Sequence, residues 1–218
     1  MSVESPLRSG ADQHFGLIET LRYEPTLGCV RVQMHLARMA ASARQFGKLF
    51  DQKQAATKLD AIQSVTPLRV RLFLGEDDDL SLTTHAFLPV SHGKVWTVAI
   101  AATKIDATNS LLAHKTSLRQ TYDAARAEFD PAIIDEVLLT NQHGHLCEGT
   151  ITNLFVQTDG AFVTPPLADG LLRGVLRQEL LETGKAVEGR LLPADLTRHR
   201  FFIGNSLRGL IAARLQQD

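Results

Sequence analysis

Apolar side chains recur along this chain at two spacings, one typical of strands and the other typical of helices. Residues 68–74, LRVRLFL, alternate between aliphatic side chains and Arg69, Arg71 or Phe73, which predicts a strand with one buried face. Other short apolar runs predict further strands at 15–22, 80–87, 95–101, 136–140, 151–157, 161–164, 188–191 and 201–204.

Helical spacing marks several of the segments between these strands. In residues 35–46 the side chains of Leu36, Met39 and Ala43 share one helical face, and apolar side chains in residues 51–65 recur at intervals of three and four. Further helices are expected from Leu118 and from Val175, with one helical turn at 193–196. The mixture of strands and helices, without an internal repeat, predicts an α/β chain.

The segment 148–177, EGTITNLFVQTDGAFVTPPLADGLLRGVLR, contains the most informative loop. Its Asp159-Gly160 pair is favoured in two-residue hairpin turns. Gly174 then precedes the predicted helix, where free backbone N–H groups and the positive end of the helix dipole favour an anion such as phosphate. Many loops of this kind only cap a helix, so the loop alone leaves the function open.

Composition and charge exclude some classes of function. The 218 residues are 44% hydrophobic, enough for a sizeable core in one compact unit or two small lobes. The formal net charge is −1, so no overall basic field favours nucleic acid or anionic lipid. No apolar run reaches membrane-spanning length and no signal peptide is recognisable, which predicts a cytoplasmic protein without membrane or nucleic-acid partners.

The cysteine and histidine residues do not predict a metal site. Cys29 and Cys147 lie far apart without metal-ligand spacing, so we expect two reduced thiols, with one disulfide as the alternative. His143 and His145 lack a third ligand at a suitable spacing. Residues 1–13 are polar and predict a mobile lead-in.

The order of motifs resembles the class IV aminotransferases, the fold-type IV enzymes of pyridoxal phosphate (PLP). The matching motifs are ETLR at 19–22, HLAR at 35–38, HKTSLR at 114–119, EGTITNLF at 148–155 and GLLRGVLR at 170–177, so the resemblance covers nearly all of the chain from Phe15. It implies an α/β (α+β) fold with a small α/β lobe at 14–103, a connector at 104–110, and a larger β-rich pseudo-barrel lobe at 111–218 that binds PLP against the first.

The resemblance implies roles for residues that would otherwise be interpreted as ordinary. Taken alone, Lys115 is a surface lysine, Arg38 a solvated helix residue and Glu148 an acid at a strand start. By resemblance, Lys115 is the Schiff-base lysine and catalytic base, Arg38 holds the PLP phosphate, and Glu148 contacts the pyridine nitrogen. A cation or helix start beside a lysine lowers its pKa and favours the neutral amine that such a role needs. The other implied cofactor contacts are Gly174, Val175, Leu176, Asn205 and Ser206.

Within the class, the details resemble the aminodeoxychorismate lyases, which release p-aminobenzoate and pyruvate for folate biosynthesis. The resemblance lies in HKTSLRQTYDAAR, in GVLRQELL with Leu176 where branched-chain aminotransferases usually carry threonine, and in FIGNSLRGL. Thr20 falls where the lyases carry a threonine near the substrate, so it is a second candidate catalytic residue. Arg69 and Arg71 either point into water or bind a substrate carboxylate.

Two other functions remain open from the sequence. One is a PLP-dependent aminotransferase of branched-chain or D-amino acids, and the other is a non-catalytic relic of a synthase–lyase fusion. The resemblance also implies a small-molecule amine substrate, a homodimer, and aminodeoxychorismate synthase as a candidate partner. Departures from the family lie at the N-terminus, where an extra hairpin is missing, at Arg173 in place of a common proline, and after Leu210. They concern the substrate pocket and dimer edge more than the PLP site.

Overall fold

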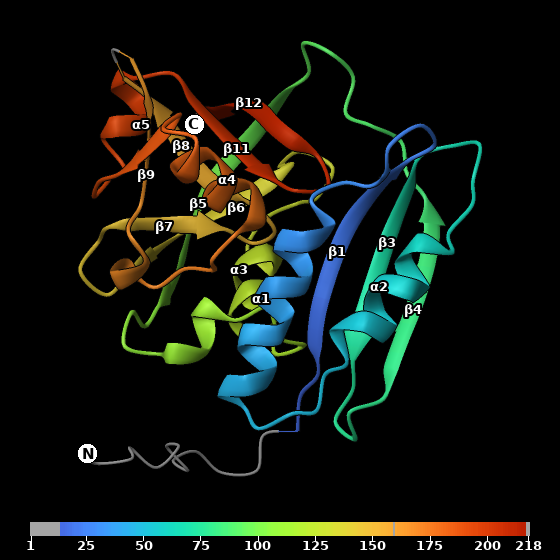
Figure 1. Ribbon diagram of the computed structural model, residues 1–218. Helices are drawn as coiled ribbons and strands as arrows, with labels where there is room; N and C mark the ends of the chain where they lie inside the picture. Colours follow the sequence, from blue (N-terminus) through green and yellow to red (C-terminus); the bar gives the residue numbers. More distant parts are fainter. Residues whose placement is uncertain (1–13, 159, 217–218) are drawn as a thin grey trace.

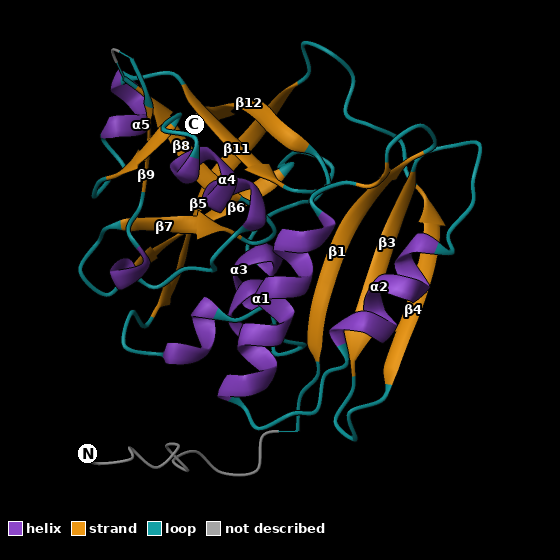
Figure 2. Cartoon of the chain, in the orientation of Figure 1, coloured by secondary structure: helices purple, strands orange, loops and turns teal. Residues whose placement is uncertain are grey.

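The computed structural model describes residues 14–158 and 160–216 and contains two β-sheets (Figure 1, Figure 2). The first is four-stranded with the order β2-β1-β3-β4, and the second is eight-stranded with the order β10-β9-β8-β11-β12-β5-β6-β7. The strands of the first sheet are β1 (Leu17–Glu24), β2 (Gly28–Cys29), β3 (Leu68–Leu74) and β4 (Leu80–Ala86). Those of the second are β5 (Val95–Ile105), β6 (Glu136–Asn141), β7 (Leu146–Gly149), β8 (Asn153–Gln157), β9 (Phe162–Thr164), β10 (Ala186–Glu188), β11 (Phe201–Asn205) and β12 (Gly209–Leu215).

The helices are short and join or cover the sheets. They are α1 (Val32–Gln45), α2 (Gln52–Asp60), α3 (Gln120–Ala127), α4 (Val175–Glu182) and α5 (Asp195–Arg198), with 3₁₀ turns η1 (Ser110–Ala113) and η2 (Leu167–Asp169). Helix α2 begins after Asp51, whose carboxylate accepts hydrogen bonds from Lys53 N and Gln54 N and so satisfies two free donors of the first turn. No described helix is long and apolar enough to cross a membrane.

The small sheet has one face packed on α1 and α2 and one face turned toward the rest of the molecule. Its period-2 alternation buries Leu21, Val70 and Leu72 against Met39 of α1 and Leu59 of α2. Helix α1 lies beside β1 and also contacts α4 (Figure 1). The strict alternation in 68–74 therefore predicted β3 correctly, including its bounds.

The large sheet closes on itself in part. Strand β7 pairs with β8 as well as with β6, so six strands, β8-β11-β12-β5-β6-β7, form a closed ring, in agreement with the expected pseudo-barrel. Aliphatic side chains such as Val98, Leu138 and Ile203 fill one core of this region. Helix α4 packs on Phe155 and Ala186 through Leu176 and Leu180.

Several sequence-based boundaries differ from the structure. Strand β5 pairs with β6 and β12 and so belongs to the large sheet, whereas its residues 95–103 were expected in the small lobe and 104–105 in the connector. Strands β7 and β12 were not predicted, and β10 ends at Glu188, where the predicted strand began. Asn205 is the last residue of β11, and Ser206 begins the hairpin turn to β12. Residues 1–13 and the predicted turn residue Asp159 lie outside the described residues.

Candidate active site

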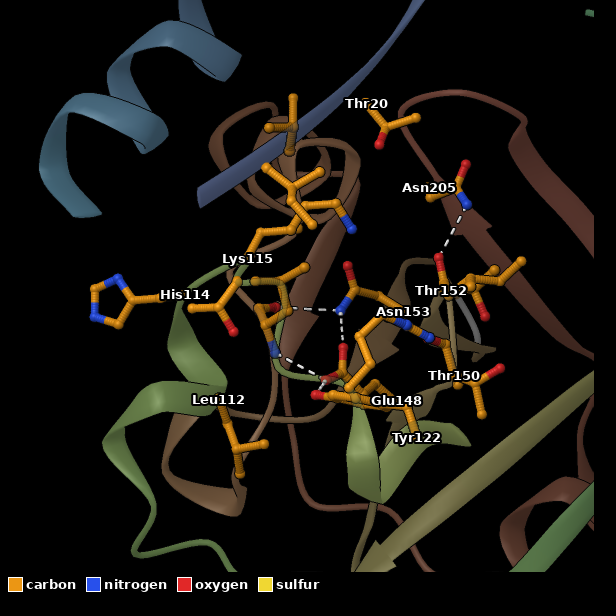
Figure 3. A pocket seen from close by; sticks show the side chains of 18 of the residues that line it. Thr20, Leu112, His114, Lys115, Tyr122, Glu148, Thr150, Thr152, Asn153 and Asn205 are labelled. Atoms are coloured by element: carbon orange, nitrogen blue, oxygen red, sulfur yellow. Dashed lines mark hydrogen bonds between the residues drawn. The ribbon is translucent and has the colours of Figure 1, made fainter. Parts of the chain in front are cut away.

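A cavity of about 540 Å³ is lined by residues of both sheets. Every site residue predicted from the sequence lines it except Leu176, whose side chain is buried against Phe155. Lys115, Glu148 and Thr20 open onto the cavity from three separate parts of the chain (Figure 3). The fold thus brings together side chains up to 190 positions apart, from Ile18 of β1 to Arg208 after β11.

Lys115 lies on an extended segment that runs beside β1. Ile18 N donates to Lys115 O at 2.8 Å, and Ser117 N donates to Gly16 O at 2.9 Å. Burial, followed by the nearby charge of Arg38, lowers the pKa of Lys115 from 10.5 to about 8. Helix α3 begins only at Gln120, so burial replaces the expected helix start as the main cause. The result is an amine that loses its proton far more readily than a surface lysine.

Glu148 lies on β7 at the opposite wall of the site. Its Oε1 accepts hydrogen bonds from Tyr122 Oη at 2.7 Å and Leu172 N at 3.1 Å, and its Oε2 accepts one from Asn153 Nδ2 at 3.3 Å (Figure 3). Burial raises the pKa of Glu148 to about 7, while these donors and the charge of Lys115 oppose that rise. A cation placed beside Glu148 would therefore favour its ionised form.

Asn153 connects the Glu148 side of the cavity with the start of α4. Its Nδ2 also donates to Leu172 O at 3.2 Å. A Cβ atom at Gly174 would lie 1.7 Å from Asn153 Oδ1, so only glycine allows the backbone to pass this close. Gly174 is the residue before α4, and no described side chain caps that helix. The first backbone N–H groups of α4 consequently remain available beside the cavity, where Val175 lines the wall.

Arg38 is held in place by a buried carboxylate that the sequence analysis did not assign to the site. Arg38 Nε and Nη2 donate to Glu19 Oε1 and Oε2 at 2.9 and 2.6 Å, and Nη1 donates to Arg173 O at 2.8 Å. His35 Nδ1 lies 2.5 Å from Glu19 Oε2, and His35 Nε2 lies 2.8 Å from Ser206 Oγ. Burial alone would raise the pKa of Glu19, but Arg38 and His35 hold it at about 2. This chain of contacts fixes Arg38 and Ser206 on the same side of the cavity.

The open face of the small sheet forms another wall. Thr20 of β1 is paired with Arg71 of β3, and Arg22 is paired with Arg69. Thr20, Arg69 and Arg71 all line the cavity. The two arginines predicted as carboxylate ligands or solvated charges therefore border the cavity, although both side chains are exposed.

Several residues of this site have no local mark in the sequence, because their partners are distant in the chain. Tyr122 follows Lys115 by seven positions, and only the fold shows that it contacts Glu148. Glu19 lies within the predicted strand 15–22 and is buried, and an acid in an apolar strand is itself a signal of a paired charge. Arg208, between β11 and β12, also lines the cavity and had no assigned role. No group of three or more potential metal ligands occurs in the part of the chain that the structure describes.

The family of the chain follows from a match over almost its full length. The family model of the class IV amino-transferases matches residues 16–215. The chain therefore belongs to the class IV aminotransferases, a family of PLP-dependent lyases and aminotransferases, and its fold is the fold type IV expected from the sequence.

Its relatives carry names from both branches of that family. A Schizosaccharomyces pombe protein provisionally named an aminodeoxychorismate lyase is 30% identical over 176 residues, which are 79% of this chain and 75% of that protein. The Saccharomyces cerevisiae aminodeoxychorismate lyase is 32% identical over 120 residues, 47% of this chain and 32% of that protein. A Mesorhizobium loti structure, provisionally named an amino-acid aminotransferase, is 43% identical with a TM-score of 0.87, covering 93% of this chain and 100% of that chain.

Proposed function

We propose that the cavity binds PLP and that Lys115 is the amine that joins the cofactor's aldehyde. The residues fit such a group. The cavity offers an amine with a pKa lowered to about 8, a buried carboxylate at Glu148, and the backbone of Gly174, which packs closely against Asn153. Arg38, Ser206 and the N–H groups at the start of α4 suit a phosphate, because they combine a fixed cation with free donors.

Each protein group has a distinct task in the proposed chemistry. When bound, PLP supplies an electron sink for the bond broken at the amine-bearing carbon of a substrate. Lys115 Nζ accepts the proton from that carbon, as its lowered pKa allows. The Glu148 carboxylate stabilises positive charge at a ring nitrogen, with Tyr122 and Asn153 orienting its oxygens. Thr20, which lines the cavity on β1, would hydrogen-bond the leaving oxygen.

We propose 4-amino-4-deoxychorismate as the substrate. Lys115 takes the proton from the amine-bearing ring carbon, the electrons displace the enolpyruvyl oxygen as its C–O bond breaks, and that oxygen receives a proton. The ring becomes aromatic, so the products are p-aminobenzoate and pyruvate. The observation that carries this choice is the cationic wall of Arg69, Arg71 and Arg208. A substrate with two carboxylates fits that wall better than a branched-chain amino acid, and the two lyase-named relatives support the same choice.

The second candidate is an aminotransferase, favoured by the name of the 43% identical relative. Such an enzyme would need a keto acid for its second half-reaction, whereas the lyase needs none. Pyruvate formation from aminodeoxychorismate without added keto acid therefore separates the two. The homodimer, the synthase partner and the cytoplasmic location stay predictions from the family resemblance.

The deciding experiment measures p-aminobenzoate release by PLP-loaded protein supplied with enzymatically generated aminodeoxychorismate. We expect release by the native protein and none by Lys115→Ala. Lys185→Ala, at an exposed lysine, is the matched control and should keep the native rate. If the native protein releases no p-aminobenzoate but shows the visible absorption of lysine-bound PLP, the lyase is overturned and the aminotransferase is favoured. A well-folded protein without that absorption would overturn the PLP site itself.

A further inference from the structure

Arg208 lies where the large sheet meets the cationic face of the small sheet. It occupies the turn between β11 and β12, two residues after Ser206, and lines the same cavity as Arg69 and Arg71 of β3. Its backbone N donates to Asn205 Oδ1 at 2.9 Å, and its guanidinium carbon lies 5.8 Å from the centre of the Trp96 ring. The turn and the aromatic ring therefore restrict where the side chain points.

Within the described part of the chain, no carboxylate forms an ion pair with this side chain. Among residues 14–158 and 160–216, the guanidinium groups of Arg69, Arg71 and Arg208 form no hydrogen bond or ion pair. Arg69 and Arg71 are exposed and can be solvated, but Arg208 is half-buried. Burial, together with the charge of Arg69, lowers the pKa of Arg208. A guanidinium stays protonated at neutral pH, so its environment is short of negative charge.

Among the described residues, the carboxylate whose charge acts on Arg208 is that of Glu136, and other donors already occupy it. Glu136 is buried and accepts five hydrogen bonds, from Val137 N, Thr150 N, Thr150 Oγ1, Ile151 N and Thr152 Oγ1. Its oxygens therefore face the turn after β7 and are not available to pair with an arginine. An anion that enters the cavity would supply the negative charge that the described residues do not.

The cavity thus offers cations at two places with different surroundings. Arg38 is committed to Glu19 and lies beside the start of α4, which suits a phosphate. Arg208 and Arg69 come from a different turn and strand, and have no such commitment. A planar, uncommitted guanidinium is well suited to paired hydrogen bonds with a carboxylate.

We propose that Arg208, together with Arg69, binds a substrate carboxylate that is not attached to the amine-bearing carbon, and so determines specificity for this kind of acid. The inference rests on the proposed function in that it takes the cavity as the substrate site. In an α-amino acid the carboxylate is attached to the amine-bearing carbon. In aminodeoxychorismate one carboxylate is on the ring and the other is on the enolpyruvyl group. Neither is attached to the amine-bearing carbon, so Arg208 could bind either one.

Equilibrium binding tests this assignment without requiring turnover. Calorimetry on PLP-loaded protein would measure the affinity for 4-hydroxybenzoate, which carries the ring carboxylate and no amine, and for pyruvate, which carries the other carboxylate. Phenol is the matched ligand without a carboxylate. The variants are Arg208→Ala, Arg208→Lys and, as a control, Arg198→Ala at an exposed position on α5. The visible absorption of bound PLP and the melting temperature verify that each variant is folded.

We expect Arg208→Ala to weaken the binding of one of the two carboxylate ligands about 10- to 100-fold. This is the loss in affinity expected when one charge-assisted hydrogen-bonding partner is removed. Arg208→Lys should recover part of that loss, because it keeps the charge but not the planar fork. Phenol binding and the Arg198→Ala control should not change. The ligand whose affinity falls identifies the carboxylate that Arg208 binds.

If Arg208→Ala binds both carboxylate ligands within about twofold of the native affinities, the assignment is overturned, whatever the lyase assay shows. The opposite outcome is also possible: Arg208→Ala loses carboxylate affinity, and the native protein releases no p-aminobenzoate. That result would support Arg208 as a carboxylate ligand while overturning the proposed lyase. The two failures are therefore distinguishable.

Discussion

At the scale of single residues, Lys115 and Glu148 have pKa values that burial moves toward neutrality from opposite directions. The pKa of Lys115 falls to about 8 and that of Glu148 rises to about 7, because burial penalises both charged forms. Both groups therefore change protonation within the range where an enzyme normally operates. This arrangement suits proton transfer more than it suits the stability of the empty protein.

The buried amine leads to a prediction about stability. In cofactor-free protein, Lys115→Met should raise the free energy of unfolding at pH 7 by about 1–3 kcal/mol, because the native state no longer holds a buried cation. The pKa of Lys115 is lower in the folded protein than its ordinary 10.5, so folding favours the neutral amine. The gain should therefore shrink as the pH rises from about 8 toward 10.5. Urea unfolding across that range measures it, and a gain that does not depend on pH would contradict the lowered pKa.

Glu19 leads to the opposite prediction. Glu19→Gln removes the anion that pairs with Arg38 and His35, and breaking a buried charge pair costs about 3–5 kcal/mol. The pKa of Glu19 is held at about 2, so its contribution is full above pH 4.5 and is lost as the pH falls from 4.5 toward 2. The difference between native and variant should disappear over the same interval.

Acid titration of unfolding, followed by circular dichroism, measures this difference. Glu182→Gln is the control, because Glu182 is exposed and accepts a single bond from Gln178; it should change stability by less than about 1 kcal/mol. Equal losses for the two variants would contradict the buried pair.

The sequence predicted those site residues that belong to short linear motifs and missed those defined by contacts across the fold. Lys115, Arg38 and Glu148 each stand in a motif that marks them. Tyr122 and Arg208 acquire their positions only when α3 and the β11–β12 turn pack against the cavity. A single sequence contains no local signal for such a contact.

At the scale of elements, the turn between β7 and β8 is organised around Glu136. The Glu136 carboxylate accepts hydrogen bonds from Thr150, Ile151 and Thr152, while backbone carbonyls of this turn accept hydrogen bonds from other elements. Thr150 O accepts from Arg119 Nη2 at 2.9 Å, and Ile151 O accepts from Asn205 Nδ2 at 3.0 Å. One carboxylate thereby fixes a turn that lines the cavity between Glu148 and Asn153.

Glu136→Gln tests the importance of this turn. The amide replaces one acceptor oxygen by a donor, so at least one backbone N–H of the turn loses its partner at a cost of about 1–3 kcal/mol. We expect a lower melting temperature and faster hydrogen exchange at Ile151 N. Glu128→Gln is the matched control, because Glu128 accepts from Ala102 N and Thr103 N at an exposed position. Unchanged exchange at Ile151 would show that the turn holds its shape without Glu136.

The strength of alternation explains which elements were predicted well. Strand β3 has one buried and one open face, and its period of two marks it clearly. All four residues of β7 are buried, so it shows no alternation, and it is shorter than most strands. The assignment of β5 to the wrong lobe has another cause. Its partners β6 and β12 lie far along the chain, and strand pairing at that separation leaves no trace in local spacing.

At the scale of the whole molecule, neither sheet forms the site alone. The small sheet and α1 supply Thr20, Arg38 and Arg69, whereas the large sheet and its turns supply Glu148 and Ser206. The hydrogen bond from Arg38 to Arg173 O and the one between His35 and Ser206 cross between these two parts. A ligand that engages both walls should therefore tie the two parts together.

PLP binding should accordingly protect both parts of the molecule from hydrogen exchange at once. With cofactor at about 100 times its dissociation constant, linkage adds about 2.7 kcal/mol to the stability of the state that binds it. We expect slower exchange in α1 and in the first turn of α4 together, measured by mass spectrometry with and without PLP.

In Arg38→Met the protection of α1 should be lost preferentially, because that side chain is the proposed link between α1 and the phosphate. Arg44→Met, on the exposed end of the same helix, is the control and should leave the protection intact. Protection confined to α4 in the native protein would mean that the small sheet does not take part in binding the cofactor, and the phosphate role of Arg38 would be wrong.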